Sequence, residues 1–525
     1  MNTKNPYRGL LYFIICLAAV NLCGVLYAAN TTFLYYWDNS TYWEISNLLA
    51  SQKWNADFFK DLYQSIGTLD YNYLAGLLSA LAAKALGNSR MVYILSILNF
   101  YTLPSYMILY SLSKKISRRP VMAAAAVSLM TPLILFAGLA GFVDVGGMLL
   151  CLLCYRLYWI REPDEQRIYK SVLLGILLTL TFLFRRYFAF FALSFLVGMA
   201  GDCILFSRRK RDLLIVVAEM ALILFLLFPD FLFNKLAADY GTMYASYKFA
   251  FSTDLKILTR YFGILTLAAA IIGTIAYTWI KRLRQTVFVW IQLGVCFALF
   301  ASTQTHGQQH LLMYVPGICT LLLILFEQLE HPVMTGIFWA LAAANTINPC
   351  IPRQQPQSIR EIRGYAVIPN FNFLPSKRQD TEEIYAVKQY LNEHIPAEAK
   401  VTVLASSFII NDDILRKCEL SLNRPQTRPD YLTAAPAVDS RDTDLEPLFE
   451  AAYMLVAFPA QTHLGEENQR VIVEAVRSFE VNADFAQAFE PIGDDMQVGD
   501  ITLRLYRRTR RVTDFEKYEL KQRLK

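Results

Sequence analysis

Long apolar runs alternate with short polar segments over the first two-thirds of the chain. The runs lie at about residues 8–29, 91–113, 120–140, 145–160, 171–184, 187–206, 213–233, 259–280, 285–303, 309–328 and 332–349. A helix needs about 20 apolar residues to cross the hydrocarbon core of a bilayer, and most of these runs approach that length. The pattern therefore predicts an α-helical polytopic membrane protein with about 11 transmembrane helices.

Basic residues at the ends of several runs predict the orientation of the chain. The clusters are Lys114-Lys115 with Arg118-Arg119, Arg161 with Arg167 and Lys170, Arg208 to Arg211, and Lys281-Arg282 with Arg284. Lys and Arg are enriched in cytoplasmic loops. When every cluster is cytoplasmic, the predicted spans alternate without conflict. The N-terminus is then cytoplasmic and the segment after residue 349 is extracytoplasmic, in a protein of the cytoplasmic (inner) membrane.

A shorter apolar stretch at about residues 70–86 lies within the first predicted outer loop, residues 30–90. Counting it as a span would invert every later loop and move the basic clusters outside. Its apolar residues share one helical face: Leu74, Leu77, Leu78, Leu81 and Ala85. Tyr42, Ile45 and Leu49 form a similar face earlier in the loop. We therefore expect two helices that lie in the membrane interface.

The distribution of charge agrees with a membrane protein. Of the 525 residues, 55% are hydrophobic and 18% are charged, whereas globular chains carry about a quarter charged residues. Residues 1–370 have a net charge of +12 and residues 371–525 a net charge of −6. The basic excess belongs to membrane loops, where it sets orientation, and it gives no indication of nucleic-acid binding.

The pattern changes after the last apolar run. Four prolines interrupt residues 350–379 and predict a linker between a transmembrane domain, residues 1–349, and a domain of residues 380–525. The last part alternates expected helices at 380–394, 411–422 and 466–479 with expected strands at 400–405, 452–458, 485–491 and 501–506. This alternation predicts an extracytoplasmic α/β domain. We expect it to pack over the outer ends of the helices and to help select an acceptor.

The predicted orientation also brings unusual polar residues to the outer ends of the spans. They are Asp38, Asp144, the Arg185-Arg186 pair, the loop from Lys235 to Arg260 and the segment from His306 to His310. None of them was used to choose the orientation. Ionisable groups at membrane depth are costly and usually functional, so their convergence predicts a site at this face.

These positions resemble motifs of the GT-C superfamily of lipid-phosphate-sugar-dependent glycosyltransferases, in particular protein O-mannosyltransferase-like enzymes and bacterial aminoarabinose transferases. Those enzymes carry an Asp-Glu pair in the first outer loop, followed by an aromatic residue; Asp38 to Tyr42 is similar, with Asn39 in place of the Glu. Asp144 resembles a further Asp after the third span, and Arg185 or Arg186 a basic residue at the fifth. The resemblance covers residues 8–330 and implies the GT-C fold.

The resemblance implies an inverting hexosyl- or pentosyltransferase that moves a sugar from a polyprenyl-phosphate-linked donor to an extracytoplasmic lipid, glycan or protein. It implies Asp38 as the general base and an arginine at the departing phosphate. The expected substrate-binding residues are Asp144, Arg185, Arg186, Gln309, His310, Tyr42 and His306. No cofactor is expected. Asn39 removes one carboxylate from the pattern of metal-binding members, so we expect a metal-free site.

Other interpretations of the same residues remain open. Asp38 is also a suitable N-cap for the helix that follows it, and Arg185 and Arg186 are suitable interfacial anchors. A polymerase or ligase of surface polysaccharide is an alternative enzyme. A transporter or flippase of lipid-linked sugars is an alternative outside enzymes, although the sequence shows neither the internal repeats nor the broken helices typical of transporters.

Overall fold

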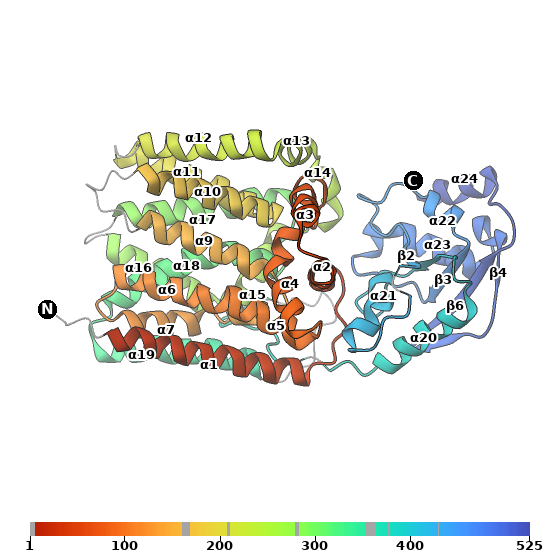
Figure 1. The fold of residues 1–525 in the computed structure, drawn as a ribbon, viewed down its shortest axis with the longest axis horizontal. Coiled ribbons are helices and arrows are strands. Elements are labelled where there is room, and N and C mark those ends of the chain that lie inside the picture. Colours follow the sequence, from red (N-terminus) through yellow and green to blue (C-terminus); the bar gives the residue numbers. More distant parts are fainter. Residues whose placement is uncertain are drawn as a thin grey trace.

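The computed structural model describes residues 6–159, 168–206, 210–278, 283–351, 364–375, 377–428 and 430–524. A bundle of long helices and an α/β domain lie end to end, with the N-terminus at the far end of the bundle (Figure 1). Several residues used for the orientation lie outside the described residues: Arg161, Arg167, Arg208, Arg209, Lys281 and Arg282. The predicted orientation itself and the predicted domain boundaries stay predictions.

Several helices in the described residues are suited to crossing a membrane. Four are long and apolar enough by length and composition alone: Tyr7–Asn30, Arg90–Ile116, Arg186–Phe206 and Arg284–Thr303. The number rises to 7 if each of three bent helix pairs is counted as one span. A multi-pass helical protein is therefore confirmed, whereas the number of about 11 spans stays a prediction.

Three predicted spans are broken. α7 (Pro120–Met130) meets α8 (Leu133–Leu139) at 62°, α12 (Lys210–Leu227) meets α13 (Pro229–Ala237) at 100°, and α15 (Phe251–Phe262) meets α16 (Ile264–Thr278) at 89°. Pro132 and Pro229 lack the amide hydrogen of a continuous helix, and Gly263 has φ 78°, which glycine adopts without strain. The continuous spans predicted at 120–140, 213–233 and 259–280 are wrong, and so is the expected absence of broken helices.

The other helical segments of the bundle agree closely with the remaining predicted runs, except for two short segments at 240–247 that no run predicted. They are α1 (Pro6–Asn30), α5 (Arg90–Ile97), η2 (Leu98–Thr102), α6 (Leu103–Ile116), α9 (Asp144–Trp159), α10 (Ile168–Phe184), η3 (Arg186–Phe188), α11 (Ala189–Phe206), α14 (Tyr240–Met243), η4 (Ala245–Tyr247), α17 (Leu283–Thr303), η5 (Gln309–Met313), α18 (Val315–Gln328), α19 (Pro332–Ile347) and η6 (Asn348–Cys350). α10 packs between α9 and α12, and α11 packs against α17. Their buried faces form one apolar core through the bundle.

The first outer loop crosses the end of the bundle that faces the α/β domain (Figure 1). Its elements are α2 (Asp38–Ser51), α3 (Ala56–Thr68), η1 (Tyr73–Gly76) and α4 (Leu77–Leu86). α4 leaves Leu78 and Leu81 exposed, as an interfacial helix requires. Tyr42, Ile45 and Leu49 are instead buried, because α2 packs against α4. The interfacial face predicted for α2 is therefore wrong, and α3 was not predicted.

The α/β domain contains a mixed sheet of six strands within the described residues, in the order β2-β1-β3-β6-β4, with β5 paired to β6. The strands are β1 (Val401–Leu404), β2 (Leu432–Ala434), β3 (Tyr453–Phe458), β4 (Phe489–Pro491), β5 (Met496–Val498) and β6 (Ile501–Arg508). β1 runs parallel to β2 and β3, whereas β6 runs antiparallel to β3, β4 and β5. This confirms a small α/β domain.

Helices cover both faces of this sheet. They are α20 (Thr381–His394), α21 (Asp412–Ser421), α22 (Glu446–Glu450), α23 (Arg470–Val481) and α24 (Asp514–Arg523), with the short turns η8 (Glu466–Asn468) and η9 (Asp484–Ala488). One core forms beneath α20 and α21, and a second beneath α23. The predicted strand at 485–491 is wrong in its first half, which is the η9 turn.

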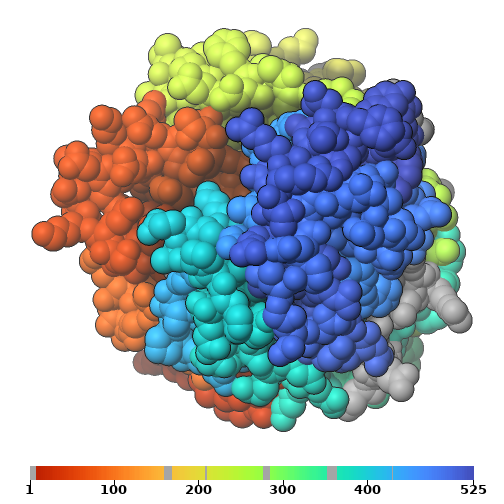
Figure 2. All heavy atoms as spheres, turned by 90° about the vertical axis from the view of Figure 1, so that its right-hand side faces the viewer, coloured from red at the N-terminus to blue at the C-terminus, as the bar shows by residue number. Residues whose placement is uncertain are grey.

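The α/β domain is docked on the first outer loop. Leu34 is fully buried in the core that lies beneath α20 and α21. Arg90, at the start of α5, donates to the carbonyl oxygen of Thr31 at 2.8 Å and also to that of Ser421. Figure 2 shows the domain covering much of the end of the bundle, with the first outer loop at its rim. The outer-loop residues thus lie between the bundle and the domain.

Candidate active site

Asp38 is the first residue of α2 and lies at the junction between the bundle and the domain. Its Oδ2 accepts a hydrogen bond from Arg185 Nη2 at 2.9 Å, and its Oδ1 accepts one from the Tyr71 hydroxyl. The side chain is 25% exposed. Burial alone would raise the pKa of Asp38, but the charge of Arg185 and the Tyr71 hydrogen bond outweigh burial and lower it. Asp38 is therefore an ionised carboxylate that substrate can reach.

Arg185 joins Asp38 to the second predicted carboxylate. It lies between α10 and η3, and its Nε donates to Asp144 Oδ1 at 2.9 Å. Its Nη1 donates to the Tyr42 hydroxyl at 2.8 Å, and its guanidinium lies 4.8 Å from the centre of the Tyr42 ring. Arg185 is 9% exposed and Asp144 1%. One buried arginine therefore binds two carboxylates and a hydroxyl, each through a different nitrogen of its planar guanidinium.

The segment before α18 closes one side of this cluster. The Tyr187 hydroxyl lies 2.7 Å from Asp144 Oδ1 and 3.2 Å from the carbonyl oxygen of Gln309. The ring of His310 contacts that of Tyr187, with centroids 4.8 Å apart, and its Nδ1 accepts the Gly307 amide hydrogen at 2.8 Å. An accepting Nδ1 makes the imidazole neutral, with its proton on Nε2. Gln309 and His310 are both partly exposed.

His306 is oriented away from this cluster. Its Nδ1 lies 2.5 Å from Asp254 Oδ1 and its Nε2 lies 2.6 Å from the Tyr314 hydroxyl. The ring is fully buried. Both ring nitrogens are engaged inside the protein, so this geometry suits a positioning role better than contact with a substrate.

A second group of charges lies at the rim. Arg186 Nη1 and Lys235 Nζ lie 2.7 and 2.8 Å from the same oxygen, Asp70 Oδ1. Arg186 also donates to the Tyr244 hydroxyl at 2.6 Å. Two partly exposed cations thus share one carboxylate that is 56% exposed. The group keeps a net positive charge and is suited to binding an anion.

The structure does not support the interpretation of Asp38 as an N-cap, because Asp38 is the first residue of α2 itself. Trp37 occupies the N-cap position, and its side chain makes no capping hydrogen bond. Its backbone has φ 49° and ψ −129°, close to a turn conformation that glycine usually adopts. A bulky residue in such a conformation costs about 1–3 kcal/mol and persists only where its surroundings hold it. The residue before Asp38 is therefore under strain.

The site contains residues that sequence reasoning did not single out. Tyr71 and Tyr187 bind the two carboxylates, and Asp70 and Lys235 complete the rim group. A signal was present for three of them, because Asp70-Tyr71 opens the apolar stretch at 70–86 and Tyr187 directly follows the arginine pair. Lys235 was signalled only as the first residue of the loop at 235–260 predicted to lie at the same face, and in the structure it lies in the last turn of α13.

The arrangement does not fit a divalent metal between the two carboxylates. Arg185 occupies the position between Asp38 and Asp144 that a bridging cation would need. Among the residues that the structure describes, no group of three or more His, Cys, Asp or Glu side chains is arranged to hold a metal ion. The positive charge at this position comes from the protein itself.

A helical bundle with a carboxylate–arginine cluster at one end, covered there by an α/β domain, defines a multi-pass membrane protein of GT-C fold. Two comparisons establish the fold. ArnT of Cupriavidus metallidurans, solved with undecaprenyl phosphate, has a TM-score of 0.55 and 10% identity over 94% of this chain and 97% of ArnT. Mycobacterial arabinofuranosyltransferase AftD has a TM-score of 0.50 and 13% identity, over 96% of this chain and 40% of AftD. No protein-family model and no curated protein matches the chain.

Proposed function

We propose that the chain is an inverting GT-C glycosyltransferase that moves a sugar from a polyprenyl-phosphate-linked donor to an acceptor outside the cytoplasmic membrane. The observation that carries the proposal is the reachable, ionised Asp38 beside a positively charged rim. Both lie at the end of a membrane bundle, where a lipid head group arrives. ArnT, which has the same fold, was solved with undecaprenyl phosphate.

The reaction is a single displacement at the anomeric carbon. The acceptor oxygen forms a bond to this carbon while the bond to the phosphate oxygen breaks and the configuration inverts. Asp38 takes the proton of the acceptor and later releases it to water. The products are the glycosylated acceptor and polyprenyl phosphate, and no oxidant or further reactant is needed.

The departing phosphate gains negative charge, which the rim group is placed to stabilise. Arg186 and Lys235 share Asp70 as their counter-ion, and an incoming phosphate can displace this exposed carboxylate. Arg185 has a different role, because its three nitrogens are already bound to Asp38, Asp144 and Tyr42. We assign Arg186 to the phosphate and Arg185 to the base.

The remaining candidate residues form two groups, one with buried side chains and one with partly exposed side chains. Asp144 and Tyr42 are almost fully buried and position Arg185. Gln309 and His310 are partly exposed beside this cluster and are placed to contact the sugar or its phosphate. The neutral imidazole of His310 offers its Nε2 proton to such a ligand. His306 supports the segment that carries them.

The deciding experiment replaces Asp38 by Asn in purified full-length protein supplied with a labelled polyprenyl-phosphate sugar and cell-envelope acceptor. Asp38→Asn keeps the shape of the side chain but cannot accept the proton, so transfer should fall by about 10²-fold or more. Asp61→Asn is the matched control, because Asp61 is an exposed residue of α3 in the same loop. Transfer by Asp38→Asn at the rate of this control would refute the role of Asp38.

A further inference from the structure

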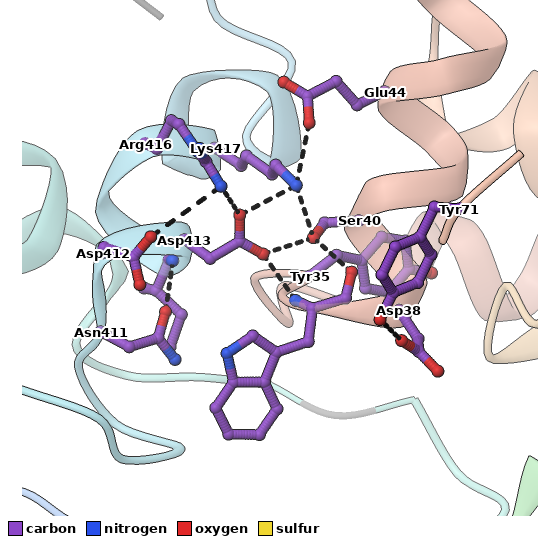
Figure 3. Close-up of polar contacts among 12 residues, drawn as sticks. Tyr35, Asp38, Ser40, Glu44, Tyr71, Asn411, Asp412, Asp413, Arg416 and Lys417 are labelled. Carbon is purple, nitrogen blue, oxygen red and sulfur yellow. Dashed lines mark hydrogen bonds and ion pairs between the residues drawn. The ribbon is translucent and has the colours of Figure 1, made fainter. Parts of the chain in front are cut away.

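A side chain of the α/β domain binds the strained turn that precedes Asp38. Asp413 lies in the first turn of α21, which Asn411 caps by accepting the Ile414 amide hydrogen at 2.7 Å. Asp413 Oδ2 accepts the Trp37 amide hydrogen at 2.5 Å and the Ser40 hydroxyl hydrogen at 2.7 Å (Figure 3). The residues on both sides of Asp38 are therefore bound to one oxygen of another domain.

This contact supplies what the start of α2 lacks. The first amide groups of a helix have no partner within the helix, and the side chain of Trp37 provides none. Asp413 provides an acceptor and places a negative charge at the positive end of the helix dipole. It also holds the Trp37 amide while the backbone is at φ 49°.

Asp413 is itself fixed by neighbouring cations. Lys417 Nζ lies 2.9 Å from Asp413 Oδ1, 2.9 Å from Glu44 Oε2 and 3.1 Å from Ser40 Oγ. Arg416 lies 2.6 Å from Asp413 Oδ1. Asp413 is 5% exposed and Lys417 is 2% exposed. A buried carboxylate with this many partners has one available position.

We propose that Asp413 is a positioning residue for the base. It fixes the backbone from Trp37 to Ser40, so that Asp38 faces Tyr71 and Arg185. The α/β domain thereby completes the active site, and the base is in place only when this domain is docked. The inference rests on the proposed function of Asp38, and its test separates the two.

The test compares Asp413→Ala with Asp412→Ala in the full-length protein. Asp412 is the preceding residue of α21, and the described residues show it paired with Arg416 at 3.9 Å and with no residue of α2. Hydrogen exchange of the amides at residues 37–41 should be faster in Asp413→Ala and unchanged in Asp412→Ala. This measurement needs no substrate, so it does not depend on the proposed function.

Steady-state kinetics then test whether loosening the turn at Trp37 displaces the carboxylate of Asp38. In Asp413→Ala, kcat should fall about 10-fold or more, because small displacements of a catalytic group are costly. The KM for the donor should stay within about twofold, since Arg186 and Lys235 are untouched. Asp413→Asn should recover part of kcat, because its amide oxygen can still accept the Trp37 amide hydrogen.

The pH profile distinguishes positioning from a loss of folded protein. The charged or titratable groups around Asp38 in the described residues include Arg185, Tyr42, Tyr71, Tyr187 and His310. If Asp38 moves away from Arg185 and Tyr71, its pKa rises and the acid limb of kcat/KM shifts to higher pH. Removing the charge of Asp413 without any movement would shift the limb the other way, and partial unfolding would not shift it.

Two results would overturn the inference. The first is unchanged exchange at residues 37–41. The second is an unchanged kcat and acid limb in Asp413→Ala while Asp38→Asn is inactive, which leaves the proposed function standing. If Asp413→Ala does not fold, Ser40→Ala removes one bond to the same oxygen and should shift exchange and the acid limb in the same direction by less. Ser40→Ala behaving like the wild-type protein would equally overturn it.

Discussion

Replacing Arg185 by Met should destabilise the protein and impair the base at the same time. The substitution introduces an apolar side chain of similar length and removes a cation that contacts both Asp38 and Asp144. Asp144 is 1% exposed, so it would become a buried carboxylate without a counter-ion. Breaking a buried ion pair in this way costs about 3–5 kcal/mol, whereas a surface pair contributes about 0–1 kcal/mol.

The structure places the expected loss near the lower end of that range. Asp144 keeps the hydrogen bond from the Tyr187 hydroxyl at 2.7 Å, and a hydrogen bond to a charged group contributes about 1.5–3 kcal/mol. Asp38 is 25% exposed, so water can partly replace Arg185 there. We therefore expect about 3 kcal/mol for Arg185→Met. Arg185→Lys should lose less, because it keeps the charge but has one nitrogen in place of the three that bind Asp38, Asp144 and Tyr42.

The measurement is a double-mutant cycle on unfolding in detergent, with Asp144→Asn as the second substitution. Asp144→Asn removes the buried charge that Arg185→Met leaves without a counter-ion, so the double variant should be more stable than Arg185→Met alone. Effects that add to within about 0.5 kcal/mol would refute the pairing. The activity gives an independent check. Arg185 lowers the pKa of Asp38, so its loss raises that pKa and the acid limb of activity should move to higher pH.

Three further outcomes are expected. Arg186→Ala and Lys235→Ala should each raise the KM for the donor and lower kcat, about 10-fold in each case, because they bind the phosphate before transfer and stabilise the charge it gains during transfer. An unchanged kcat and KM would contradict this role. Transfer should continue at its full rate in EDTA, because Arg185 supplies the charge between the carboxylates; a loss of activity that Mg²⁺ or Mn²⁺ restores would contradict it. A reporter fused after Lys525 should be active only outside the cytoplasm, and a cytoplasmic signal would reverse the predicted orientation.

The long helices could be predicted from the sequence because hydrophobicity determines what a membrane accepts. The bends could not, because the apolar runs continue across Pro132, Pro229 and Gly263 and an average over a window does not detect one residue. The apolar face of α2 could be recognised from the sequence, but its partner could not. An amphipathic face shows that a surface is buried, but α4 rather than lipid covers Tyr42 and its neighbours.

The sequence could predict which candidate residues lie on the same side of the membrane and can therefore meet in one site. Asp38, Asp144 and Arg185 converge because they end neighbouring segments at one face. Their partners depend on contacts between distant residues, with Tyr71 lying 33 positions and Asp413 376 positions from the residues they bind. The spacing of His306 and His310 predicts a shared face only in a helix, and His306 lies in a non-helical segment that turns it toward Asp254.

The low pKa of Asp38 explains why its position matters more than its basicity. A carboxylate bound by Arg185 and Tyr71 is a weak base, but it is ionised over a wide pH range. The acceptor becomes acidic only as its oxygen bonds to the sugar, so a weak base suffices if it already lies at the proton. Such a base depends on the groups that hold it in place, here Arg185 from the bundle and, through the backbone, Asp413 from the α/β domain.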